Sequence, residues 1–106
     1  MINNVTLVGN IANEPVLSGS NALVLRFSIA VNEWMGENPE RTSFFDCVLF
    51  GKRAAALREI LKKGMKVAIA GKLRSSTYEK DGQKRYSVEV IINDIELPPL
   101  PPKNEA

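Results

Sequence analysis

The chain has 106 residues, of which 44% are hydrophobic, and a formal net charge of +2; this is enough material for one domain with one core. Its single cysteine and its lack of histidine exclude an internal disulfide, a Cys/His zinc site and histidine-based triads or dyads. We therefore expect no catalytic residue, no metal and no cofactor, and an inert thiol at Cys47 in the apolar run Cys47–Phe50. No apolar run approaches the roughly 20 residues of a membrane span, and the first residues do not resemble a signal peptide. A cytoplasmic protein without a membrane partner is expected.

The charge is unevenly distributed along the chain. Between Lys52 and Arg85 there are eleven basic and three acidic residues, a net charge of +8, so the remainder carries −6. A basic block of this kind favours a polyanionic partner, although charge alone fits a solvated surface equally well.

Two strands are predicted in the first third of the chain. Apolar and polar residues alternate over Val5–Ile11, and again over Leu23–Trp34 after a turn-rich stretch at 13–21. In the second strand the apolar residues share one face, which leaves Arg26 and Trp34 on the opposite face.

A loop at 35–40 precedes a third strand over Thr42–Phe50. This strand is apolar on both faces, so the pattern leaves open which one is the core. If the face of Asp46 points outward, Phe44 and Phe50 are solvent-facing aromatics on the same side.

One short helix is predicted over Arg53–Lys63, because apolar residues recur there at helical spacing. Lys62 and Lys63 suit the negative end of the helix dipole, and Gly64 can supply a left-handed C-terminal cap.

Two more strands, Lys66–Glu79 and Lys84–Leu97, flank Asp81-Gly82, a pair that favours a hairpin turn. In the first of them, parity places Val67, Ile69 and Leu73 in the core. The opposite face then holds Lys72, Arg74 and Tyr78.

The element order is three strands, one helix and two strands. It matches an all-β, five-stranded OB-fold Greek-key barrel with one short α-helix between strands three and four. We expect this domain to span residues 1–97 and the proline-rich segment 98–106 to form an extended, flexible tail.

Aromatic rings interleaved with cations suit single-stranded nucleic acid, because bases stack on the rings while Lys and Arg follow the phosphates. For the phenylalanines, the alternative is that they fill the core or a subunit interface. The candidate stacking residues are Trp34, Phe44, Phe50 and Tyr78, and the candidate phosphate contacts are Arg26, Lys52, Lys72, Arg74, Lys84 and Arg85.

The chain resembles the bacterial single-stranded DNA-binding protein family over nearly all of residues 2–97. The likeness rests on the segments Asn4–Asn10, Val48–Lys52, Leu61–Gly64, Val67–Arg74, Tyr78, Gly82–Tyr86 and Glu89-Val90. The resemblance implies an OB fold, a homotetramer and single-stranded DNA as partner, bound without sequence specificity in replication, recombination and repair. It also implies base stacking at the positions of Trp34, or its neighbour Met35, Phe44, Phe50 and Tyr78.

The chain departs from the family pattern at Asp46, an acid on the proposed DNA face, and by lacking the acidic C-terminal tip that recruits replication and repair enzymes. Such partners remain an open expectation. Two alternatives are a dimeric, primosome-type accessory protein that also binds a helicase, and an OB-fold nuclease, which the scattered acids suit poorly.

Overall fold

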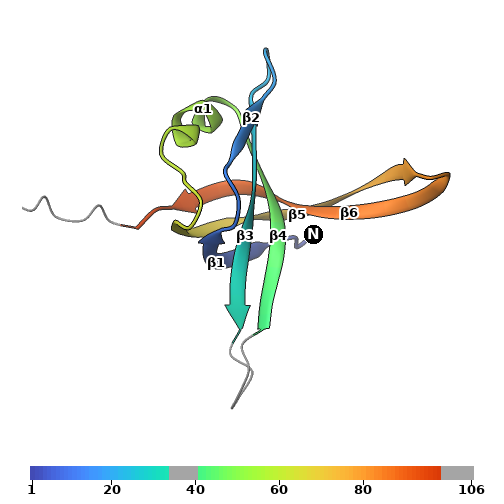
Figure 1. Ribbon diagram of the computed structural model, residues 1–106, viewed down its shortest axis with the longest axis horizontal. Coiled ribbons are helices and arrows are strands. Elements are labelled where there is room, and N and C mark those ends of the chain that lie inside the picture. Colours follow the sequence, from blue (N-terminus) through green and yellow to red (C-terminus); the bar gives the residue numbers. More distant parts are fainter. Residues whose placement is uncertain (34–40, 99–106) are drawn as a thin grey trace, which may run out of the picture.

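The computed structural model describes residues 1–33 and 41–98, which form six strands and one helix (Figure 1). The elements are β1 (Val5–Ile11), β2 (Val16–Ser18), β3 (Val24–Glu33), β4 (Arg41–Phe50), α1 (Lys52–Arg58), β5 (Lys66–Lys80) and β6 (Gln83–Glu96). The strands lie in the order β1-β5-β6-β4-β3-β2, and β1 also pairs with β3, so the sheet closes on itself.

The five long strands have the predicted barrel topology, with β4 and β6 as the parallel neighbours and the other pairs antiparallel. The sixth strand, β2, was not predicted. It lies within the stretch read as turns, where Val16–Ser18 pairs with Val24–Arg26 of β3. Three residues are too few to show an alternating pattern, which explains why the sequence did not reveal it.

The core is built from inward-facing residues of every long strand. Alternate residues of β3 are buried as predicted, with Leu25 and Ile29 fully inaccessible. On β4 the inward residues are Cys47 and Leu49, so the face that carries Asp46 points outward. The choice that the sequence left open is thereby resolved.

Helix α1 is shorter than predicted, since it ends at Arg58 instead of Lys63. Ala54 and Leu57 are its buried residues. Beyond the helix Leu61 is buried in the core whereas Ile60 is exposed, which a continuous helix with both on its apolar face would not allow. Gly64 has a positive φ of 92°, but it does not cap α1; its N–H donates to the carbonyl of Ile11 at 2.7 Å. Among the described residues, no helix is long and apolar enough to cross a membrane.

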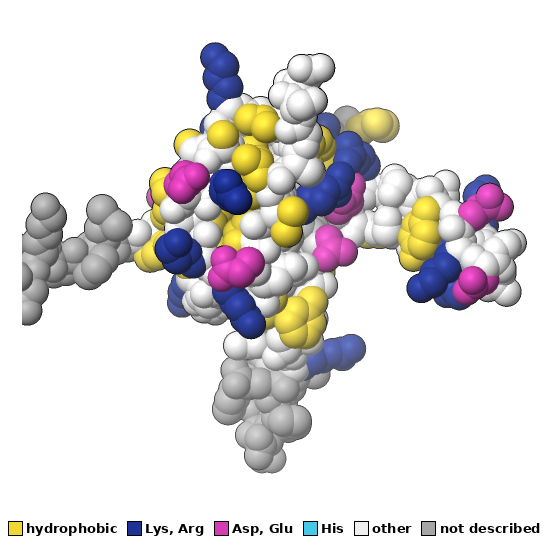
Figure 2. Space-filling view, turned by 45° about the horizontal axis from the view of Figure 1, so that its top comes forward, with side chains coloured by type: hydrophobic (Ala, Val, Ile, Leu, Met, Phe, Trp, Pro, Cys, Tyr) yellow, Lys and Arg dark blue, Asp and Glu magenta, His cyan; other side chains and the backbone are white. Residues whose placement is uncertain are grey.

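Strands β5 and β6 are much longer than the barrel requires. Beyond Gly71 they leave the barrel as a two-stranded arm, residues 72–88, which extends to one side in Figure 1 and stands clear of the barrel in Figure 2. The predicted turn at its tip is confirmed, because Asp81 and Gly82 have φ values of 53° and 74°.

The pairing of β5 with β6 shifts register between Ala70 and Gly71, where the arm begins. A Cβ at Gly71 would lie 2.0 Å from the carbonyl oxygen of Ile91. A residue with a side chain therefore cannot take this position unless the backbone moves. The prediction that Leu73 is a core residue was wrong, since its exposed fraction is 44%. Leu73 continues the alternation of Val67 and Ile69, but no other part of the described chain packs over its side chain as the core does over theirs.

The base of the arm is also held from the N-terminus. The side-chain amide of Asn3 donates to the carbonyl of Leu73, and its amide oxygen accepts from the N–H of Leu73, both at 2.9 Å. Strand β1 pairs with β5 up to Val5 and Gly71, so Asn3 continues this edge by two hydrogen bonds from a side chain.

Candidate nucleic-acid interface

The outer face of β3, β4, β5 and β6 is organised as rows of register partners. One row contains Arg74, Glu89, Asp46 and Ser28, each on a neighbouring strand. The adjacent row contains Lys72, Ile91, Val48 and Arg26. Register partners project from the same side of a sheet. The barrel wall and the base of the arm therefore share one side of the sheet, which we call the outer face; on it Val48 and Ile91 are buried beneath their neighbours.

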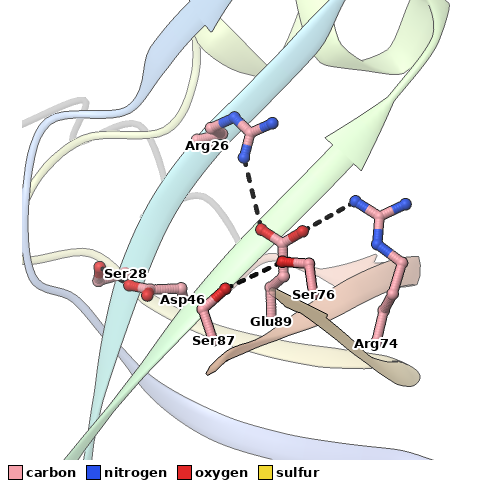
Figure 3. Close-up of polar contacts among 7 residues, drawn as sticks. All are labelled: Arg26, Ser28, Asp46, Arg74, Ser76, Ser87 and Glu89. Atoms are coloured by element: carbon pink, nitrogen blue, oxygen red, sulfur yellow. Dashed lines mark hydrogen bonds and ion pairs between the residues drawn. The ribbon is translucent and has the colours of Figure 1, made fainter. Parts of the chain in front are cut away.

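Glu89 links two arginines on this face. Its carboxylate accepts from Arg74 at 2.8 Å through Oε1 and from Arg26 at 3.4 Å through Oε2, so each guanidinium contacts a different oxygen (Figure 3). The Glu89 side chain is 16% exposed, whereas both arginine side chains are about half exposed. Each guanidinium keeps further N–H donors, so both remain able to bind a phosphate.

The sequence did not single out Glu89 as an electrostatic partner. Its position depends on the parallel pairing of Asp46 with Glu89, and local alternation does not encode which distant strands become neighbours.

Asp46 lies beside Glu89 in a hollow of the outer face. The Ser28 hydroxyl donates to Asp46 Oδ1 at 2.9 Å, and the Ser28 N–H donates to Asn13 Oδ1 at the same distance. The hollow has a volume of about 330 Å³, and its polar lining comes from Asn13, Arg26, Ser28, Asp46 and Glu89. It is open to solvent and contains both signs of charge.

Three aromatic side chains project from the same face. The exposed fractions are 67% for Phe44, 43% for Phe50 and 48% for Tyr78. Phe44 and Phe50 lie on either side of Asp46 along β4, and the guanidinium carbon of Arg74 lies 5.6 Å from the Phe50 ring centroid. This cation–π contact places a positive charge directly beside a ring that could stack on a base.

The remaining predicted site residues occupy different places. Lys52 is the first residue of α1, two residues after Phe50, and Arg85 is the register partner of Tyr78 on the arm. Lys84 lies on the reverse face of the arm, since it pairs with Glu79. Trp34 lies outside the described residues.

The reverse face of the arm carries an apolar group that the sequence analysis did not single out. Leu73, Tyr86 and Val88 share it by parity and are all exposed. The alternating pattern in β5 and β6 predicted that each strand has two faces, and the face of Leu73 was interpreted as core. The pattern did not indicate that both faces of the arm are exposed to solvent.

The side chain of Cys47 is buried in the core, on the opposite side of β4 from Asp46. Burial, followed by the negative charge of Asp46, raises its pKa to about 12. The thiol is thus protonated and unreactive at neutral pH. Within residues 1–33 and 41–98, no three His, Cys, Asp or Glu side chains gather as a metal site would require.

The closed strand order and the exposed aromatics among cations define an OB-fold with a surface of the nucleic-acid-binding type. The model of the single-strand binding protein family matches residues 2–98. The chain belongs to this family.

Several relatives in sequence are named single-stranded DNA-binding proteins. The chain is 31% identical to the single-stranded DNA-binding protein of Clostridium perfringens, over 91% of this chain and 65% of that protein. It is 37% identical to the corresponding protein of Borreliella burgdorferi, over 91% and 69%, and 34% identical to that of Treponema pallidum, over 91% and 57%. The chain thus spans about two thirds of the length of these relatives, or somewhat less.

Among solved structures, the Plasmodium falciparum SSB in complex with ssDNA superposes with a TM-score of 0.81 at 26% identity, covering 92% of this chain and 93% of that one. The small single-stranded DNA-binding protein of Streptomyces coelicolor gives a TM-score of 0.75 at 27% identity, covering 92% and 96%. The OB fold predicted from the sequence is confirmed.

Proposed function

We propose that this protein is a non-catalytic single-stranded DNA-binding protein that covers and protects strands exposed in the cytoplasm during replication, recombination and repair. The observation that carries the proposal is the gathering of Phe44, Phe50 and Tyr78 with Lys72 and Arg74 on the outer face. The ssDNA complex of the structurally similar Plasmodium falciparum protein supports it.

The bases stack on the exposed rings while the cations between the rings bind phosphates. Phe44 and Phe50 are six residues apart on one strand, which is about 20 Å at the rise of a β-strand. This separation fits several nucleotides, in line with the roughly 4–16 nucleotides bound by other OB folds. Arg26, Lys52 and Arg85 extend the cationic part of the path.

Binding of an oligothymidylate, followed by fluorescence anisotropy at low salt, tests the function directly. A folded protein that leaves the oligonucleotide unbound would refute it. In the expected case, the logarithm of the affinity falls with the logarithm of salt concentration by about 0.7 per phosphate neutralised. A flat salt dependence would contradict the role of the cations.

The arm offers a matched pair of variants for the proposed surface. Tyr78 lies on the outer face and Tyr86 on the reverse face, and both are exposed. We expect Tyr78→Ala to weaken binding by about 1–3 kcal/mol, the contribution of one stacked base, and Tyr86→Ala to have little effect when light scattering shows that the two variants have the same oligomeric state. Equal losses in the two variants would show that the outer face does not select the path of the DNA.

Self-association into a homotetramer is part of the proposal. Exposed apolar side chains support it, since Val8 on β1 and Leu73, Tyr86 and Val88 on the arm leave apolar surface uncovered in a single chain. Light scattering should give four times the chain mass. A stable dimer would instead favour an accessory replication protein, and degradation of DNA with added magnesium would favour a nuclease.

A further inference from the structure

Asp46 is an acid in the middle of a face that otherwise suits phosphate binding. Glu89, its register partner, is neutralised by Arg26 and Arg74. Within the described ranges, no lysine or arginine nitrogen lies within 4.0 Å of the Asp46 carboxylate. Asp46 thus presents a negative charge to any ligand on this face.

The carboxylate of Asp46, which has no cationic partner among the described residues, repels a phosphate that comes close to it, so the sugar-phosphate backbone is not expected directly over Asp46. A base with an exocyclic amino group, such as cytosine, is a different ligand, because that group is a hydrogen-bond donor. Ser28 occupies Asp46 Oδ1 and fixes the orientation of the carboxylate, while the remaining acceptor capacity stays available to a donor from outside.

The position of Asp46 also fits an approaching base edge. It lies two residues from Phe44 on the same side of β4, which is about 7 Å along the strand. The hollow of about 330 Å³ opens at this point. A base that stacks on Phe44 can therefore place its edge over the hollow, with the carboxylate at the wall.

We propose that Asp46 is a specificity-determining residue that accepts a hydrogen bond from the amino group of cytosine, so that this protein prefers cytosine to thymine or uracil at one position per chain. Carboxylates accept from cytosine N4 in known protein–DNA contacts. The N3–H of thymine or uracil lies between two carbonyl oxygens, which the carboxylate repels. The proposal rests on the proposed DNA-binding function.

Deoxycytidine and deoxyuridine oligomers of equal length provide the test, because they have the same ring and differ at the amino edge. We expect the full chain to bind the cytosine oligomer more tightly by at least about fivefold, the lower end for one good base contact. In Asp46→Asn this ratio should fall towards one, and affinity for the uracil oligomer should rise because the repulsion is gone.

Glu96→Gln is the matched control, since it removes the same charge from the end of β6, where Glu96 lines a hollow with Val8 and Leu97 away from β4. It should leave the ratio unchanged. Ser28→Ala is a second variant that keeps the carboxylate but removes the hydroxyl that orients it, and it should lower the ratio part of the way.

A ratio near one in the unmodified chain would overturn the proposal. An equal gain for both oligomers in Asp46→Asn would also overturn it, because Asp46 would then only repel phosphate. Failure of the folded protein to bind either oligomer at low salt would refute the DNA-binding function itself, and the proposal with it.

Discussion

Strands β5 and β6 run through both the barrel and the arm, but their alternating side chains are buried on one side in the barrel and exposed on both sides in the arm. In the barrel, the inward residues of β5 and β6, such as Ile69 and Val90, are buried. In the arm, both faces of the same strands are exposed, and Tyr78 on one side and Val88 on the other contact solvent. An alternating pattern thus reports that a strand has two faces, but not that either face is covered.

The largest difference between barrel and arm is expected when one leucine in each region is replaced by alanine. Leu25 is fully buried in the barrel, whereas Leu73 is 44% exposed at the base of the arm. We expect Leu25→Ala to lower the free energy of unfolding by about 2–5 kcal/mol, as for other buried leucines, and Leu73→Ala to lower it by less than about 1 kcal/mol. Urea denaturation followed by circular dichroism, at a protein concentration too low for self-association, measures both, and similar losses there would contradict the comparison; a loss at Leu73 that grows with protein concentration is what the proposed homotetramer predicts.

The boundary between the two regions can be tested at Gly71. Its missing side chain leaves room for the carbonyl oxygen of Ile91, so Gly71→Ala should destabilise the protein by about 1–3 kcal/mol through forced backbone movement. Gly82 at the arm tip is a control in which nothing lies within 4 Å of an added Cβ. Gly82→Ala has only the strain of its positive φ, of order 1 kcal/mol. Thermal unfolding of the two variants should differ in this direction; the reverse order would refute the close contact at the boundary.

One component of the pH dependence of stability should report on the barrel, through the buried thiol of Cys47. The Cys47 thiol has its pKa raised from 9.0 to about 12 by burial and by Asp46. The unfolded chain therefore loses this proton first, and stability falls as the pH rises above 9, by about 1 kcal/mol between pH 9 and 10. Comparison of unfolding curves at the two pH values with those of Cys47→Ala checks the origin, because the variant should lack this component. An unchanged decline would assign it to other groups.

The smallest loss of stability is expected from removing the ion pairs of Glu89, which link Arg26 on the barrel to Arg74 at the base of the arm. Glu89→Gln removes the charge that pairs with Arg26 and Arg74, but both guanidiniums are half in solvent, so we expect a loss of no more than about 1 kcal/mol in urea denaturation. Glu79→Gln on the exposed arm is the matched control and should change stability less. A loss above about 3 kcal/mol would indicate a desolvated pair instead.

Features with a local physical cause could be predicted from the sequence. The Asp81-Gly82 turn follows from tolerance of positive φ, and the burial of Leu25, Phe27 and Ile29 follows from alternation in one strand. The helix was predicted five residues too long, because the spacing of Ile60 and Leu61 resembles a helical stripe even though only Leu61 is buried.

Part of the candidate site could also be predicted from the sequence. Parity placed Lys72, Arg74 and Tyr78 together, and the structure brings Phe44 and Phe50 to the same outer face. Their roles in DNA binding stay predictions, as does that of Trp34. The Arg26–Glu89–Arg74 contact was not foreseen, because it depends on β4 and β6 pairing across 43 positions of sequence between Asp46 and Glu89.

The two hydrogen bonds between Asn3 and the backbone of Leu73 have a consequence for local opening. The amide hydrogen of Leu73 belongs to a half-exposed residue, yet it can exchange with water only when Asn3 lets go. The exchange rate at Leu73 therefore reports how often this contact between the N-terminal segment and the base of the arm opens. A side chain of the third residue thus holds the N-terminal segment to the base of the arm, just beyond the last β1–β5 pair of Val5 and Gly71.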